Sequence, residues 1–102
     1  MGEFAKVAKV GELSEDSCKL VEAGGKRIAL IRTEKGYCAI DDSCTHKGGP
    51  LSEGEVEGNE VTCPWHGARF NIESGDALSA PAPSGVSCYP VRLEGDDILI
   101  EV

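Results

Sequence analysis

Hydrophobic and polar residues alternate along most of the chain in short stretches, which is the pattern of half-buried β-strands. Turn signals such as Gly24-Gly25 and Gly58-Asn59 separate these stretches. The predicted strands are Ala5–Val10, Ser17–Glu22, Lys26–Thr33, Tyr37–Asp41, Glu60–Thr62, Arg69–Ile72, Val86–Glu94 and Ile98–Val102. Because no stretch has the period of a long amphipathic helix, we expect an all-β fold, a small antiparallel β-sandwich or barrel.

Residues 43–83 differ from the rest of the chain. The predicted strands in this region are very short, glycine and proline are frequent, and both histidines of the sequence, His46 and His66, lie within it. Loops that are positioned by a rigid scaffold commonly carry function. We therefore expect a single domain over residues 1–102, with a loop-rich subdomain at approximately 43–83 inserted into a β scaffold.

The charge of the chain excludes some classes of partner. The sequence has 18 acidic and 10 basic residues and a formal net charge of −8, whereas nucleic-acid binding requires clustered lysine and arginine. No apolar run approaches the ~20 residues that span a bilayer, and the N-terminus lacks the apolar core of a signal peptide. We expect a cytoplasmic monomer with no nucleic-acid or membrane partner.

The sequence contains five cysteines, and an odd number cannot form a complete disulfide framework. Three of them, Cys18, Cys38 and Cys88, lie in predicted strands. Cys38 alternates in phase with Ile40, and Cys88 with Val86, as on a core-facing side. We interpret all three as buried, inert thiols, since no spacing suggests a redox role or a second metal site.

The other two cysteines lie with both histidines in two short motifs. The first arm is Cys44-Thr45-His46-Lys47-Gly48-Gly49-Pro50, the second arm is Cys63-Pro64-Trp65-His66-Gly67, and sixteen residues separate His46 from Cys63. Each arm offers one thiolate and one imidazole, so together they make a four-ligand metal site. Common zinc modules pair like ligands, whereas mixed pairs suit a two-iron cluster in which one iron takes both cysteines and the other both histidines.

These motifs resemble the Rieske 2Fe–2S family. The resemblance extends over nearly the whole chain, and the stretch Cys63–Asn71 is similar to stand-alone Rieske ferredoxins. It implies one Rieske-type 2Fe–2S cluster as the cofactor. It also implies that Cys44 and Cys63 hold the buried iron, and that His46 and His66 hold the outer iron.

Four positions depart from the Rieske proteins of respiratory and photosynthetic complexes. Those relatives have an additional cysteine in each arm, which form a disulfide, where this chain has Gly49 and Trp65. They also place a serine and a tyrosine hydroxyl against the cluster, where this chain has Ala68 and Phe70. Hydrogen bonds to the sulfurs stabilise the reduced state, so their absence predicts a potential near the bottom of the family range, roughly −150 mV.

The resemblance implies a one-electron carrier. Such a ferredoxin passes electrons from a flavin-dependent ferredoxin reductase to a terminal Rieske oxygenase of aromatic catabolism. It is not itself the oxygenase, which needs a further iron held by two histidines and a carboxylate, because the cluster uses both histidines of this chain. Two alternatives are the small subunit of an assimilatory nitrite reductase and, from another class, a structural zinc-binding module. Trp65 either packs over the arms or contacts a redox partner.

Overall fold

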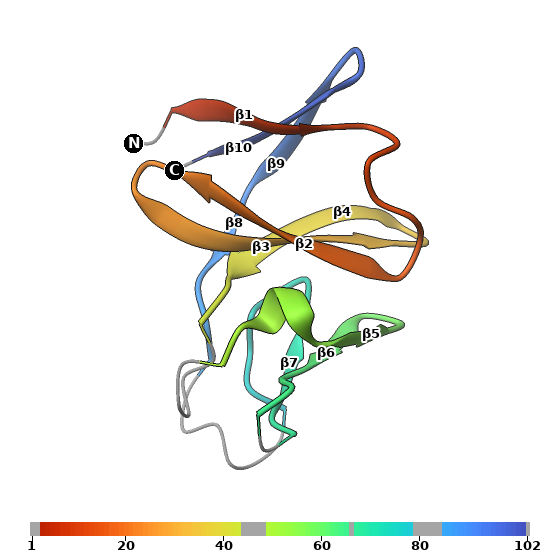
Figure 1. Ribbon diagram of the computed structural model, residues 1–102, viewed down its shortest axis with the longest axis vertical. Coiled ribbons are helices and arrows are strands. Elements are labelled where there is room, and N and C mark those ends of the chain that lie inside the picture. The colour runs from red at the N-terminus through yellow and green to blue at the C-terminus, as the bar shows by residue number, and fades with distance from the viewer. Residues whose placement is uncertain (1–2, 44–48, 66, 79–84, 102) are drawn as a thin grey trace.

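The computed structural model describes residues 3–43, 49–65, 67–78 and 85–101. Within them the chain forms three antiparallel sheets stacked in layers (Figure 1). We call them the outer sheet (β1-β10-β9), the middle sheet (β2-β3-β4-β8) and the arm sheet (β5-β6-β7). The strands are β1 (Phe4–Lys9), β2 (Ser17–Ala23), β3 (Lys26–Thr33), β4 (Gly36–Asp41), β5 (Glu55–Glu57), β6 (Glu60–Thr62), β7 (Arg69–Asn71), β8 (Cys88–Tyr89), β9 (Val91–Glu94) and β10 (Asp97–Glu101).

The expected all-β, antiparallel fold is confirmed. The helical structure among the described residues is one 3-10 turn, η1 (Leu51–Glu53). It precedes the arm sheet in the chain (Figure 1). No helix in the described part of the chain is long and apolar enough to cross a membrane.

The middle sheet separates two hydrophobic cores, and β3 contributes to both. Successive side chains of a strand point to opposite faces. Ile28 and Leu30 therefore lie in a first core with the outer sheet, while Ala29 and Ile31 lie in a second core with the arm sheet. All four side chains are 0% exposed. Burial on both faces explains why this strand is a continuous apolar run rather than an alternating one.

The second core attaches the two arms to the scaffold. The middle sheet supplies Ala29, Ile31 and Ile40 to it, and the segment that contains η1, the arm sheet and part of the second arm supplies six further buried residues. These are Leu51, Val61, Cys63, Ala68, Phe70 and Ile72. A residue of the candidate metal site is thus part of the same packed cluster that holds the sheets together.

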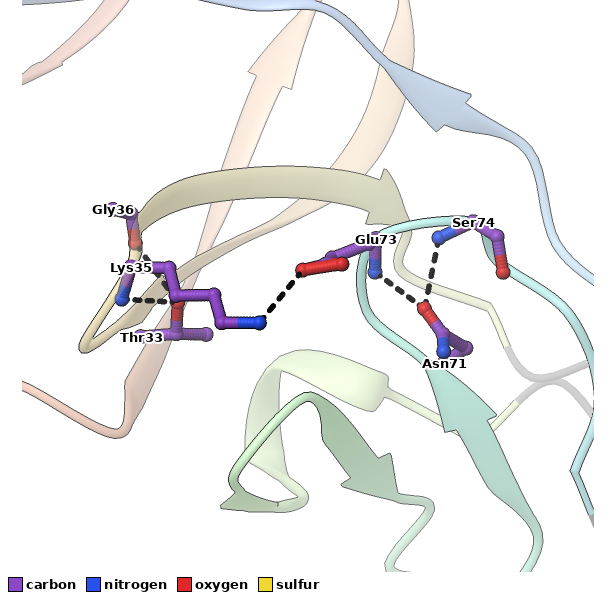
Figure 2. Close-up of polar contacts among 6 residues, drawn as sticks. All are labelled: Thr33, Lys35, Gly36, Asn71, Glu73 and Ser74. Carbon is purple, nitrogen blue, oxygen red and sulfur yellow. Dashed lines mark hydrogen bonds and ion pairs between the residues drawn. The ribbon is translucent and has the colours of Figure 1, made fainter.

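An exposed polar contact joins the turn after β3 to the turn after β7 (Figure 2). Lys35, in the turn between β3 and β4, has its Nζ 3.9 Å from Oε1 of Glu73, and both side chains are well exposed. Such surface pairs contribute at most about 1 kcal/mol. The Oδ1 of Asn71 accepts the backbone N–H groups of Glu73 and Ser74 at 2.8 and 3.0 Å, which fixes the turn after β7. This exposed ion pair therefore adds little to the attachment, to which the apolar burial of the second core contributes far more.

The predicted strand Val86–Glu94 is wrong as a single element. The structure has two strands there, β8 and β9, and they belong to different sheets. Pro90 lies between them and has no N–H to donate to a ladder, while its carbonyl accepts the N–H of Glu101 at 3.0 Å. The break at Pro90 lets the chain cross from the middle sheet to the outer sheet.

Two short elements were missed, namely η1 and β5. β5 alternates two glutamates with Val56, and it pairs with β6 across a turn in which Gly58 has a positive φ of 62°. A strand of three residues carries too little alternation to be distinguished from a solvated acidic stretch.

The prediction of three buried thiols is correct in part. Cys18 and Cys38 are half-buried and pack against the second core. Cys88 is exposed, which contradicts the prediction. It lies in the two-residue strand β8 at the edge of the middle sheet, so it has a paired strand on one side only.

Truncation of a buried side chain of β3 should cost far more stability than truncation of an exposed one. We expect Leu30→Ala to lower the free energy of unfolding by about 2–5 kcal/mol, because it leaves a cavity in the first core. Leu93 in β9 is 52% exposed, so Leu93→Ala should cost about 0.5 kcal/mol or less. Denaturant titration of both variants measures the difference, and equal losses would contradict the two-core arrangement.

Candidate metal centre

Cys63 is the predicted ligand that the structure describes in detail. It follows β6 directly, and its side chain is buried in the second core. Its N–H donates to the carbonyl of Ala68 at 2.7 Å, and its Sγ accepts the N–H of Trp65 at 3.4 Å. A backbone N–H directed at a sulfur stabilises negative charge on it, as a metal-bound thiolate requires.

Gly49, in the first arm, approaches this sulfur closely. A Cβ at Gly49 would lie 2.7 Å from Sγ of Cys63 and 3.0 Å from Cγ of Trp65, so a larger side chain would collide with both. Gly49 and Trp65 are also the positions at which the respiratory Rieske relatives have their disulfide. In this chain the two arms meet there through a close packing contact.

The described part of the centre fits an iron–sulfur cluster. It offers a buried sulfur, a backbone donor to that sulfur and a glycine that leaves room beside it. The other predicted ligands, Cys44, His46 and His66, lie outside the described residues. In the described ranges there is no group of three or more histidine, cysteine or acidic side chains that could hold a metal elsewhere.

Ala68 and Phe70 follow the second arm in the chain. Both are fully buried in the second core. Neither has a hydroxyl, so neither side chain can donate a hydrogen bond to a sulfur. The low potential expected from the sequence therefore stays a prediction.

Trp65 packs against the first arm and is also half exposed. Its Cβ and Cγ lie against Gly49, while 49% of the residue remains exposed. It therefore packs between the arms and also presents an aromatic surface to solvent beside the candidate centre.

The half-buried thiols are held in their unreactive form. Burial, followed by the charge of Asp42, raises the pKa of Cys18. Burial, followed by the charges of Glu73 and Cys88, raises the pKa of Cys38. Since the thiolate is the reactive form, these directions agree with inert thiols at neutral pH.

Sequence reasoning missed two carboxylates, Asp41 and Asp42, at the point where β4 leads into the first arm. Asp41 accepts the hydroxyl of Tyr89 through Oδ1 and the N–H of Ser87 through Oδ2, the latter at 3.2 Å. Burial, and then this hydrogen bond, raise the pKa of Tyr89 to about 12. The signal was an acidic pair at the end of an apolar strand directly before Ser43.

The model of the Rieske [2Fe-2S] domain family matches residues 3–90. The chain belongs to the Rieske [2Fe–2S] family. Its cofactor is a Rieske-type 2Fe–2S cluster.

Relatives and solved structures narrow the type of Rieske protein. The chain is 37% identical over 91 residues to the ferredoxin component of the naphthalene 1,2-dioxygenase system of Pseudomonas aeruginosa, which covers 89% of this chain and 88% of that one. It is similar to the ferredoxin of carbazole 1,9a-dioxygenase from Nocardioides aromaticivorans, with a TM-score of 0.91, 25% identity and 95% of each chain covered. A complex of reduced oxygenase and oxidized ferredoxin in carbazole 1,9a-dioxygenase matches with a TM-score of 0.90 and 26% identity, covering 96% of this chain and 92% of that one.

This Rieske protein is accordingly an electron carrier of the ferredoxin type. It is an electron-transfer component rather than a catalytic subunit. As a component of such a system it exchanges electrons with redox partners.

Introducing a hydroxyl at Ala68, directly after the second arm, should raise the reduction potential. A hydrogen bond that favours the reduced cluster by about 1.4 kcal/mol raises a one-electron potential by about 60 mV. We expect Ala68→Ser to produce a shift of that order in protein-film voltammetry. Ala39→Ser is the control, since Ala39 is buried in the first core on the other side of the middle sheet. An unchanged potential in Ala68→Ser would show that this position does not set the potential.

Proposed function

We propose that this protein is the ferredoxin of an aromatic-ring dioxygenase system. It accepts one electron from a flavin-dependent ferredoxin reductase and delivers it to a terminal Rieske oxygenase. The observation that carries this proposal is the extent of the match to ferredoxin components. A second such component, from Pseudomonas putida, is 32% identical over 98% of this chain and 96% of its own length.

We infer that the cluster is bound by Cys44, His46, Cys63 and His66. Cys44 and Cys63 take one iron, and His46 and His66 take the outer one. The bound cluster supplies a reversible one-electron step. The chain contributes the Trp65 N–H at the Cys63 sulfur and a packed second core that excludes water from one side of the centre.

We further propose that residues 1–102 form a single domain, with the cluster-binding subdomain at approximately 43–83. The second core supports this division, because it joins the arm sheet to the scaffold by apolar packing. The carrier is a cytoplasmic monomer that meets its partners transiently. The thiols of Cys18 and Cys38, which form no disulfide, suit a reducing compartment, and the exposed face of Trp65 is the contact we assign to a partner.

The two alternatives have less support. The zinc module does not account for the match to the Rieske family model over residues 3–90. The nitrite reductase subunit does not account for the similarity to dioxygenase ferredoxins over nearly the full length of both chains.

Substitution of single cysteines tests the ligand set. We expect Cys44→Ser and Cys63→Ser to lose the visible absorbance of the cluster, because each removes a soft ligand. Cys38→Ser and Cys88→Ser are matched controls that should keep it. His46→Ala and His66→Ala should lose the low-average-g electron paramagnetic resonance signal that imidazole ligands give. A protein that contains one zinc and no iron would contradict the assignment.

Anaerobic electron transfer tests the function. We expect a catalytic amount of a flavin-dependent reductase, with one NADH supplied for every two molecules of the oxidised protein, to bleach it, and stoichiometric oxidised dioxygenase to restore its colour. In a separate assay with oxygen and NADH, product formation by the three components should depend on this protein, with the colourless Cys63→Ser variant as the negative control. Stable co-purification with a siroheme protein, together with no transfer to any dioxygenase, would instead support the nitrite reductase subunit.

A further inference from the structure

Asp42 is a buried carboxylate at the start of the first arm. It follows β4 directly and is 2% exposed. Carboxylates are rarely buried in this way unless hydrogen bonds or an opposite charge compensate for the loss of water. The partners of this side chain therefore indicate what it does.

Asp42 binds the residues that follow the first arm. Its carbonyl accepts the N–H of Leu51 at 2.6 Å, and its Oδ1 accepts the N–H of Ser52 at 2.8 Å. Next to it, Ser43 and Pro50 form an antiparallel bridge. The two ends of the segment 43–50 are thus held side by side by hydrogen bonds. Asp42 accepts two of these bonds, one through its backbone carbonyl and one through its side chain.

The middle sheet holds Asp42 itself in place. Its N–H donates to the carbonyl of Arg27 at 3.1 Å. Its Oδ2 lies 4.0 Å from a guanidinium nitrogen of Arg27, whose side chain is 62% exposed. This weak, solvated ion pair only partly neutralises the carboxylate.

A second side chain of the middle sheet binds the same residue, Ser52. Cys18 in β2 directs its thiol at the carbonyl of Ser52, with Sγ 2.9 Å from the oxygen. Ser52 therefore donates its N–H to Asp42 and receives the thiol of Cys18. The 3-10 turn η1, which continues from the first arm, is fixed to the middle sheet through both of its polar backbone groups at Ser52.

We propose that Asp42 is a positioning residue for the cluster, which fixes both ends of the first arm and holds the potential low by its charge. The inference rests on the ligand assignment proposed above. Asp42 precedes the proposed ligand Cys44 by two residues in the sequence. A negative charge near the cluster disfavours the added electron of the reduced state.

Two substitutions of Asp42 distinguish the effect of its hydrogen bond to Ser52 from the effect of its negative charge. Asp42→Asn keeps an oxygen that can accept the Ser52 N–H but removes the charge, while Asp42→Ala removes both. In excess EDTA we expect Asp42→Ala to lose its visible absorbance at least ten-fold faster than the unmodified protein. We expect Asp42→Asn to stay within three-fold of that protein and to have a higher potential. Asp41→Ala is the matched control, because Asp41 binds Ser87 and Tyr89 instead of the first arm.

Hydrogen–deuterium exchange gives a readout that does not need the cluster. In the apoproteins, the peptide that covers residues 50–54 should exchange faster in Asp42→Ala than in the unmodified protein, Asp42→Asn and Asp41→Ala. If hydrogen exchange and the rate of cluster loss are both unchanged in Asp42→Ala, Asp42 does not position the first arm. If the reduction potential is unchanged in Asp42→Asn, the charge of Asp42 does not lower the potential. If Asp42→Ala does not fold, Cys18→Ala removes the other side-chain hydrogen bond to Ser52, and the same two measurements decide.

The visible and paramagnetic resonance spectra of the unmodified protein keep the two proposals apart. A protein without a Rieske spectrum contradicts the ligand assignment, whatever the exchange data show. A normal spectrum together with an unaffected Asp42→Ala variant contradicts only the role of Asp42.

Discussion

Burial of β3 on both of its faces is the constraint on which the rest of the molecule depends. Its inner residues pack alternately against the outer sheet and against the arm sheet. The two cores therefore share one backbone, and a shift of that strand would disturb both. Because close-packed cores transmit small displacements, the geometry around Cys63 is coupled to the scaffold through Ile31 and Ile40 rather than through the exposed polar contacts.

The described part of the candidate centre combines a buried sulfur with apolar surroundings. The backbone N–H of Trp65 reaches the sulfur of Cys63, and Ala68 and Phe70, which follow the second arm in the chain, have buried apolar side chains. Such surroundings solvate the extra electron of a reduced cluster poorly, which suits a donor of low potential. The contact of Gly49 with Trp65 then gives the arms a meeting point without a covalent link.

The sequence predicted most of the strands and the four candidate ligands. It did not predict which sheet each strand joins. The strands Lys26–Thr33 and Glu60–Thr62 were predicted with the bounds that the structure has, because their apolar pattern and flanking turns are strong. The four predicted ligands depend on spacing alone, and of these the structure describes Cys63. The crossing at Pro90 and the exposure of Cys88 depend on which sheet a strand joins, and no local pattern encodes that choice.

The pairing of β1 with β10 has a consequence for the order of assembly. Phe4 of β1 lies opposite Glu101 of β10 in the outer sheet, so β1 can pair only after all the residues between them have been synthesised. Pairings of such long sequence separation form slowly. The middle sheet and the second core use residues between 17 and 89, so they can assemble earlier. The second core, which buries the predicted ligand Cys63, can thus form while β1 and β10 are still unpaired, and their pairing then closes the outer sheet on the opposite face of the middle sheet.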